Sequence, residues 1–168
     1  MRALTVRQPY ADAIVCGPKR TENRSRPIPA AHIGTTILIH AAKDPHASGV
    51  VAADFTNTPW PDTRSAILGT AVLDSCHQAA DNCCTPWGEP DGWHWQLRDV
   101  RPLPRPVPTS GALGLWTPTE AVLHDVQVQF WEPTPTAATR AATPWAEPTA
   151  DILGDMRAHI DRWEGKQT

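Results

Sequence analysis

The sequence predicts a mainly β domain of the α+β class, built as a small closed or nearly closed barrel to which a few helices are added. Residues 33–42, IGTTILIHAA, are a β-branched apolar run typical of a buried strand. Residues 92–103 alternate between apolar and polar side chains with a period of two. Several other short strands are separated by turn residues, and this succession is the pattern of a small barrel.

The first elements are a short strand and a brief helix. Residues 4–6 predict the strand, Pro9 stands where a helix begins, and Gly17 ends the apolar run that follows. Residues 17–26, GPKRTENRSR, then place a dense charge cluster just before the buried strand. Extended backbone there would put Glu22 and Arg24 on one face, and Lys19 would reach the same cavity from its rim.

The middle of the chain holds an insertion, a strand and a long loop. Residues 44–66 predict one helix at about 45–55 and a turn at 59–62. Residues 67–76 predict the next strand, in which Gly69 marks a bulge or a close approach. The loop that follows, residues 77–92, is rich in Cys, Trp and Pro, and structureless loops of this length usually bind something or form a lid.

The last strands alternate cleanly. Trp93, Trp95 and Leu97 share one face of a period-two strand, which we interpret as the core face. Four prolines within residues 102–108 then predict an extended, edge-like segment, and residues 111–116 predict a closing strand. The barrel domain is therefore expected to span residues 1–118.

Residues 119–168 are expected to be a separate tail. Residues 132–150 are low-complexity Pro, Thr and Ala, which predict a linker. Residues 151–163 place apolar side chains at helical spacing, so a C-terminal amphipathic helix is predicted. We expect residues 150–164 to dock on the barrel or on a protein partner.

Composition and charge indicate which class of ligand the chain binds. The 168 residues are 40% hydrophobic with a formal charge of −3, but residues 1–43 hold seven Lys and Arg against two acids, a net of +5 that leaves −8 for the remainder. A local cationic surface on an acidic body favours a small, selective nucleic-acid contact. The N-terminus lacks the apolar core of a signal peptide and no run is long enough to span a membrane, so a cytoplasmic protein with reduced cysteines is expected.

Cofactor and metal sites are not expected. No Gly-rich phosphate loop, G-x-S-x-G elbow or paired-carboxylate motif occurs in the sequence, so no cofactor is predicted. Cys76, His77, Cys83 and Cys84 suggest zinc, but adjacent cysteines are awkward ligands for one tetrahedral site and no C-x-x-C pair is present. The sequence therefore favours the absence of a metal site.

Five segments in order carry a family resemblance. They are VRQPYA at 6–11, GPKRTENR at 17–24, HIGTTILIHAAK at 32–43, AILGTAVLDSC at 66–76, and the run from TPWGEPDG at 85 to GALGLW at 116. Together they resemble the ASCH domain family of the PUA-like superfamily, whose signature is G-x-K-x-x-E-x-R. The resemblance covers residue 3 to about residue 118.

The resemblance implies a PUA-like small β-barrel with short helices covering its openings and a cleft lined by the signature. It also implies nucleic-acid binding, mostly of RNA. One branch of the family hydrolyses N4-acetylcytidine through a Lys, a Thr three residues later and a separate Glu. Lys19 matches that Lys, but Glu22 stands where the Thr would be, and Thr21 is one residue early.

The candidate binding residues follow from the charge cluster and its surroundings. Lys19 and Arg24 are expected to hold phosphate or base acceptors, with Glu22 orienting Arg24 or accepting from an exocyclic amine. The further candidates are the polar neighbours Gln8, Asn23 and Ser25, the strand-end residues His40 and Lys43, and Trp87 as a base-stacking ring. The predicted ligand is RNA or single-stranded DNA.

Three alternatives stay open for these residues. The charge cluster could be a structural ion-pair network that closes the end of the barrel. It could belong to a hydrolase that acts on RNA or on a modified nucleoside, with Lys19 as base and Glu22 assisting a water. The chain could also be a protein-interaction module that uses its terminal helix.

Overall fold

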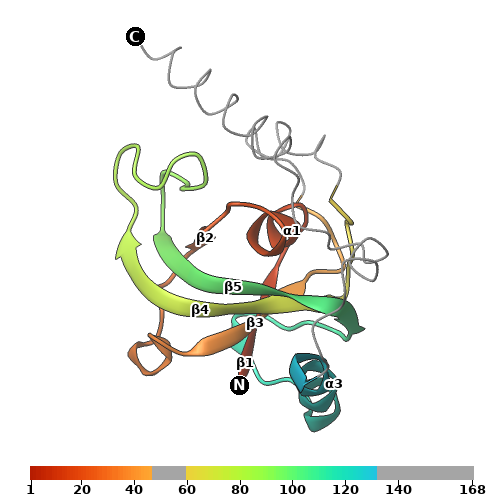
Figure 1. The fold of residues 1–168 in the computed structure, drawn as a ribbon. Helices are drawn as coiled ribbons and strands as arrows, with labels where there is room; N and C mark the ends of the chain where they lie inside the picture. The colour runs from red at the N-terminus through yellow and green to blue at the C-terminus, as the bar shows by residue number, and fades with distance from the viewer. Residues whose placement is uncertain (47–59, 132–168) are drawn as a thin grey trace.

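A single curled sheet organises the protein in the computed structural model, which describes residues 1–46 and 60–131. Its six strands lie in the order β2-β5-β4-β3-β1-β6 (Figure 1). The strands are β1 (Arg2–Val6), β2 (Thr21–Arg24), β3 (Thr36–Ala41), β4 (Ala66–Gln78), β5 (Trp93–Pro108) and β6 (Leu115–Trp116). The helices are α1 (Tyr10–Val15), the 3-10 turn η1 (Ala30–His32) and α3 (Glu120–Trp131).

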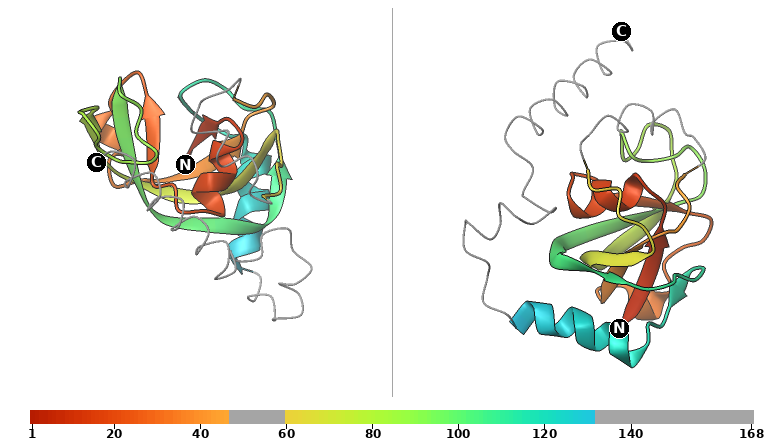
Figure 2. Two further views of the ribbon diagram at one scale, coloured as in Figure 1. Left: turned by 90° about the horizontal axis from the view of Figure 1, so that it is seen from above. Right: turned by 90° about the vertical axis from the view of Figure 1, so that its right-hand side faces the viewer.

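The predicted mainly β, barrel-like fold class is confirmed. The long strands β4 and β5 bend strongly, so that the sheet wraps around like a half-barrel (Figure 2). Strands β2 and β6 form the two edges of this sheet. The barrel therefore has a seam between β2 on one side and β1 with β6 on the other.

Alternation along the strands builds a core on each face of the sheet. Ile37 and Ile39 join the larger core cluster, which includes the buried face of α1, whereas Leu38 belongs to a second cluster. Trp95 and Leu97 are buried in the larger cluster, with Trp93 packed against it, so the predicted core face of this strand is correct.

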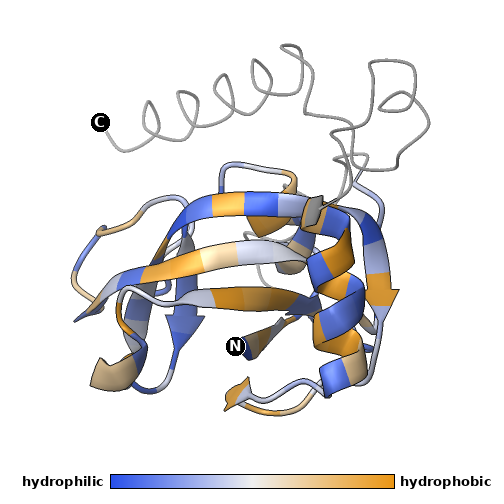
Figure 3. Cartoon of the chain, turned by 60° about the horizontal axis from the view of Figure 1, so that its bottom comes forward, coloured by the Kyte–Doolittle hydropathy of each residue, from blue (hydrophilic) through white to orange (hydrophobic). Residues whose placement is uncertain are grey.

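Helix α3 covers the second cluster and was not predicted from the sequence. Val122 and Val126 are buried in one cluster with Leu103 and Val107 of β5, and apolar and polar residues alternate along the helix (Figure 3). Gln129 Oε1 also accepts a hydrogen bond from the Arg105 backbone N–H at 2.9 Å, in the half of β5 that does not pair with β2. The segment after residue 118 thus begins with a helix that is packed on the sheet; the predicted linker and the helix at 151–163 lie outside the described residues.

The β4–β5 hairpin is longer than predicted. The proline-rich segment is the second half of β5 itself, extended as expected but not a separate element. Gly69 lies at a register shift opposite Pro102, where a Cβ would be 2.6 Å from the Arg101 carbonyl oxygen, so the predicted bulge and close approach are both present. The helix predicted at 45–55 falls mostly outside the described residues.

Within the described ranges, none of the helices combines the length and apolar character needed to cross a membrane.

Candidate functional site

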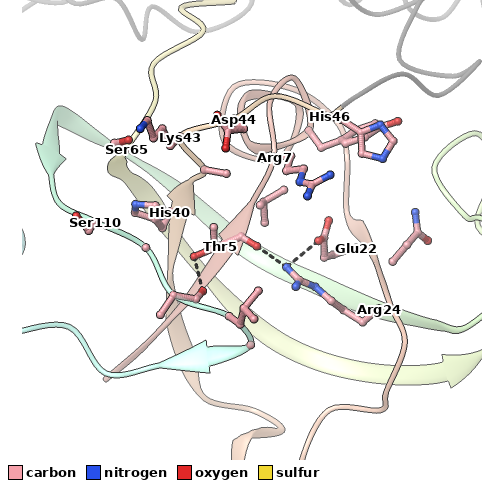
Figure 4. Close-up of a pocket in the computed structure, with 18 of the residues that line it drawn as sticks. Thr5, Arg7, Glu22, Arg24, His40, Lys43, Asp44, His46, Ser65 and Ser110 are labelled. Atoms are coloured by element: carbon pink, nitrogen blue, oxygen red, sulfur yellow. Dashed lines mark hydrogen bonds and ion pairs between the residues drawn. The ribbon is translucent and has the colours of Figure 1, made fainter.

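A pocket of about 700 Å³ lies at the seam of the barrel. One wall comes from the ends of β1 and β3, the opposite wall from β2, and the segment before β6 forms a third side (Figure 4). The charged and aromatic side chains that line it are Arg7, Tyr10, Lys19, Glu22, Arg24, His40, Lys43, Asp44, His46 and Glu89. The pocket therefore lies where the two edges of the sheet come near one another without pairing.

The Arg24 side chain bridges this seam. Its Nη2 donates a hydrogen bond to the Thr5 carbonyl oxygen of β1 at 2.6 Å and forms an ion pair with Glu22 Oε1 at 3.0 Å (Figure 4). The guanidinium also lies 5.9 Å from the centre of the Trp95 ring. Its Nε–H is buried, and within residues 1–46 and 60–131 it has no hydrogen-bond acceptor. Arg24 thus links β2 to β1 across the seam, and its Nε–H remains available as a donor to a ligand.

Lys19 is buried at the inner end of the pocket, not at its rim as predicted. The residue is 1% exposed, its Nζ donates to the Thr21 carbonyl oxygen, and it lies 3.8 Å from Glu22 Oε2. The ammonium lies between two aromatic rings, 5.3 Å from the centre of Tyr10 and 5.5 Å from that of Trp87. Burial lowers the pKa of Lys19, and Glu22 opposes this shift because a nearby carboxylate favours the charged amine.

His40 forms part of the opposite wall. Its Nε2 lies 3.0 Å from the Thr109 carbonyl oxygen, so in the neutral ring Nε2 carries the proton and Nδ1 is an acceptor. This buried Nδ1 has no partner among the described residues, and burial lowers the pKa of the imidazole. Gly111 packs closely here, since a Cβ at that position would lie 2.4 Å from His40 Cε1.

The sequence of this seam matches a known domain. The family model of the ASCH domain matches residues 4–93, which is more than half of the chain and includes most of β1, all of α1 and the whole charge cluster of β2. The chain belongs to the ASCH domain family. The resemblance inferred from the five segments is therefore confirmed.

Solved ASCH structures are similar to this chain. The crystal structure of ASCH from Zymomonas mobilis is 18% identical, with a TM-score of 0.47, and the match covers 76% of this chain and 93% of that one. A point mutant of the same protein is 19% identical, with a TM-score of 0.48 and coverage of 76% and 94%. No curated protein sequence matches. The ASCH domain is in general an RNA-binding, PUA-like fold.

Six of the nine candidate residues line the pocket, namely Lys19, Glu22, Asn23, Arg24, His40 and Lys43. Asn23 also holds a loop, because its Nδ2 donates to the Trp87 carbonyl oxygen at 2.8 Å and its Oδ1 accepts from the Glu89 N–H at 3.1 Å. The side chain of Asn23 is therefore committed to the 79–92 loop as well as being near the pocket.

Three candidates have other surroundings. Gln8 is buried outside the pocket lining; its Oε1 accepts from the Asp12 N–H at 3.1 Å in the first turn of α1, and its Nε2 donates to the Thr63 carbonyl oxygen. Ser25 is exposed and does not line the pocket. Trp87 is only 8% exposed and packs beside Lys19 and Ala13, so it is not the rim ring that the sequence suggested.

Sequence reasoning missed Arg7, Tyr10 and His46 at the pocket. Tyr10 and His46 meet edge to face with ring centres 5.3 Å apart, and burial with the nearby acids raises the pKa of the Tyr10 hydroxyl. Figure 4 shows the Arg7 guanidinium directed into the hollow between Glu22 and His46. Arg7 and Tyr10 lie in the VRQPYA segment, whose resemblance to the family was the available signal.

Thr21 does not face the pocket. It pairs with Gln96 across the β2–β5 ladder, and its Oγ1 lies 3.4 Å from Gln96 Oε1. Glu22 is on the opposite face of the strand, within the pocket lining. Glu22, and not Thr21, is therefore the β2 side chain that shares the pocket with Lys19.

A second group of polar side chains lies outside the pocket. His77, Cys83, Cys84 and His94 bring four potential metal-ligand atoms within 4.8 Å of one another. The sequence alone groups Cys76 with His77, Cys83 and Cys84 and gives no sign of His94. Cys76 instead packs against the larger core cluster, and the His77–His94 register of β4 and β5 supplies the fourth side chain.

Proposed function

We propose that this ASCH domain binds single-stranded RNA and takes one unpaired nucleotide into the pocket at the barrel seam. The observation that carries the proposal is the combination of buried Lys19 and Glu22 with the exposed cations Arg7 and Lys43 in one pocket. Proteins that bind RNA sequence-specifically usually recognise unpaired bases that are splayed out of a single strand, and a pocket of this kind can receive one such base.

The size and charge of the pocket support this proposal. A volume of about 700 Å³ is within the range of small-molecule pockets and is sufficient for a nucleotide. Arg7 and Lys43 are exposed at the pocket, where they would contact phosphate and contribute a salt-dependent share of the affinity. Asp44 and Glu89 also line the pocket and would disfavour a long polyanion track.

The inner end of the pocket suits a base edge. It offers donors from Lys19 Nζ and Arg24 Nε and an acceptor from Glu22, and His40 Nδ1 on the opposite wall is a further acceptor. Arg24 Nε and His40 Nδ1 are buried without a partner among the described residues, so a base that hydrogen-bonds to either atom would remove the cost of leaving it unpaired. Tyr10, rather than the predicted Trp87, supplies the aromatic surface beside them.

The test compares the binding affinity of the chain for single-stranded and duplex RNA, and the effects of substituting two arginines on that affinity. We expect the full chain to bind a fluorescently labelled mixed-sequence RNA strand more tightly than the same sequence as a duplex. Arg7→Gln should weaken this binding and reduce its salt dependence by about 0.7 in the log–log slope. Arg101→Gln, an exposed position on β5 outside the pocket lining, is the matched control and should bind as wild type. Equal effects of the two substitutions would contradict the proposal.

A second candidate function is hydrolysis of RNA or of a modified nucleoside. The observation that favours it is Lys19, a buried amine of lowered pKa with a carboxylate 3.8 Å away, because such an amine can act as a general base. Turnover of N4-acetylcytidine or of short RNA by wild type, lost in Glu22→Gln while binding persists, would support it. If wild type turns over neither N4-acetylcytidine nor short RNA, the hydrolase function is contradicted and RNA binding remains the proposed function.

A further inference from the structure

The cluster of His77, Cys83, Cys84 and His94 lies where β4 and β5 end and the loop of residues 79–92 joins them (Figure 1). His77 and His94 are cross-strand partners in the β4–β5 ladder, and their rings meet edge to face at 5.2 Å. The loop returns over the strand ends and adds two neighbouring thiols. Asn82 and Cys84 have positive φ values of 56° and 59° in this turn, and both sulfurs lie beside the two histidines.

The distances are close to those of a tetrahedral zinc site. Cys84 Sγ lies 3.2 Å from His77 Nε2, Cys83 Sγ lies 3.2 Å from His94 Nδ1, and all four ligand atoms lie within 4.8 Å of one another. A tetrahedron with ordinary Zn–S and Zn–N bonds has edges of about 3.3 to 3.8 Å. Small side-chain adjustments would therefore bring the four atoms to coordination distance.

Both imidazoles are already set in the tautomer that a metal requires. His94 Nε2 lies 2.8 Å from the Glu89 carbonyl oxygen, and His77 Nδ1 lies 3.0 Å from the Gln78 carbonyl oxygen. A carbonyl oxygen only accepts, so these nitrogens carry the protons and the opposite nitrogens direct lone pairs at the sulfurs. Histidine ligands of metals nearly always have such an outer hydrogen bond.

The two sulfurs also receive hydrogen bonds suited to thiolates. The Ala80 N–H donates to Cys83 Sγ at 3.3 Å, and Gln96 Nε2 donates to Cys84 Sγ at 3.2 Å. A neutral thiol is a weak acceptor, whereas a metal-bound thiolate carries negative charge and accepts strongly. His94 is fully buried and the two thiols are partly buried, so the site is shielded from water on its inner side.

We propose that His77 Nε2, Cys83 Sγ, Cys84 Sγ and His94 Nδ1 bind one structural zinc ion that fastens the 79–92 loop to the ends of β4 and β5. Two thiols and two neutral imidazoles form a closed Cys₂His₂ set with no position left for a substrate. On binding, each thiol loses its proton to solvent and the resulting thiolates neutralise the Zn²⁺ charge.

The zinc site would support one wall of the ASCH pocket. The same loop carries Trp87, whose ring packs 5.5 Å from Lys19 Nζ, and Glu89, which lines the pocket. Asn23 of β2 bonds to the backbone of both residues. Metal binding would therefore fix the position of the ring beside Lys19, although the zinc proposal itself does not depend on RNA binding.

The competing explanation is a metal-free pair of S–H···N hydrogen bonds, one from each cysteine to its histidine. Metal content distinguishes the two. We expect the full chain, expressed without a histidine tag, to retain about one zinc per chain after dialysis. The Cys83→Ser and Cys84→Ser double variant should bind zinc more than about 100-fold more weakly, whereas Cys76→Ser, a cysteine outside the cluster, should retain it.

Two further measurements do not depend on the folding of that double variant. Cobalt added to the chelator-treated wild type should give the intense visible bands of tetrahedral Co²⁺ together with a sulfur charge-transfer band. Zinc, but not magnesium, should raise its melting temperature, and Gln96→Ala should weaken zinc binding by about 10- to 100-fold. A wild-type protein without metal, without these bands and with no zinc-dependent melting shift would overturn the proposal.

Discussion

Lys19→Met removes the buried ammonium and keeps most of its stem. Of the three Nζ donors one is used by the Thr21 carbonyl oxygen, and Glu22 at 3.8 Å is an ion pair beyond hydrogen-bond length. A ligand acceptor bonded to a remaining donor would form a charge-assisted hydrogen bond worth about 1.5 to 3 kcal/mol. We therefore expect RNA binding to weaken by about 10- to 150-fold.

Stability should change far less than binding. The substitution removes the cost of burying a charge, which offsets the loss of the contacts between Nζ and the Tyr10 and Trp87 rings and the cost of about 1 kcal/mol for the unpaired Thr21 carbonyl. Glu22 retains Arg24 as its partner at 3.0 Å, so no isolated carboxylate is left in the pocket. The free energy of unfolding should stay within about 1 kcal/mol of wild type.

Lys43→Met is the matched control, because it deletes the same charge from an exposed position of the pocket. Fluorescence anisotropy with single-stranded RNA over a salt series separates the two lysines. Lys43→Met should reduce the log–log salt slope by about 0.7 with a small loss of affinity, whereas Lys19→Met should lose affinity with little change in slope. A folded Lys19→Met variant that binds RNA as wild type does would refute the assignment of Lys19 to the base.

Three stability predictions concern other parts of the fold. Burial raises the pKa of Asp12 in the folded protein, so protonated Asp12 stabilises the fold fully below the unfolded pKa near 3.9, and this stabilisation is lost as pH rises through the folded pKa. Asp12→Asn should abolish this pH-dependent loss of stability. Melting temperatures of the variant that follow those of wild type in parallel between pH about 4 and 7 would contradict the prediction. Gly69→Ala places a Cβ 2.6 Å from the Arg101 carbonyl oxygen and should cost about 1 to 3 kcal/mol in urea unfolding, an expectation that fails if the midpoint is unchanged. Val126→Ala in α3 should cost about 2 kcal/mol because Val126 is 1% exposed, whereas Val128→Ala, at 38% exposure on the same helix, should cost under about 0.5; equal costs would show that α3 does not pack as described.

Local patterns in the sequence were sufficient to predict where the main strands lie and which charged residues line the seam. The alternation of Trp93, Trp95 and Leu97 identifies a core face because side chains on a strand alternate strictly between its two sides. The same rule places Glu22 and Thr21 on opposite faces of β2, as the structure confirms. The G-x-K-x-x-E-x-R spacing identified the family and three residues of the pocket.

Helix α3 was not predicted, although its pattern is present in the sequence. Val122, Val126 and Gln129 follow a helical spacing, and Thr119 Oγ1 accepts the Val122 N–H at 3.3 Å as a helix cap. This pattern stands just before the Pro- and Thr-rich residues 132–150, and no element is predicted from the sequence for residues 119–131. The burial of its apolar face depends on Leu103 and Val107, which are distant in sequence.

The sequence by itself determined which strands form, which of their faces is apolar, and which family the chain belongs to, because these depend on periodicity and spacing within short segments. Only the tertiary structure decided that Lys19 and Trp87 are buried together, and that His94 pairs with His77 beside two loop cysteines. Those juxtapositions depend on cross-strand register and on the path of a loop. Both are set by long-range pairing and packing, and a shift of one residue in register would turn the side chains of a strand to the opposite face.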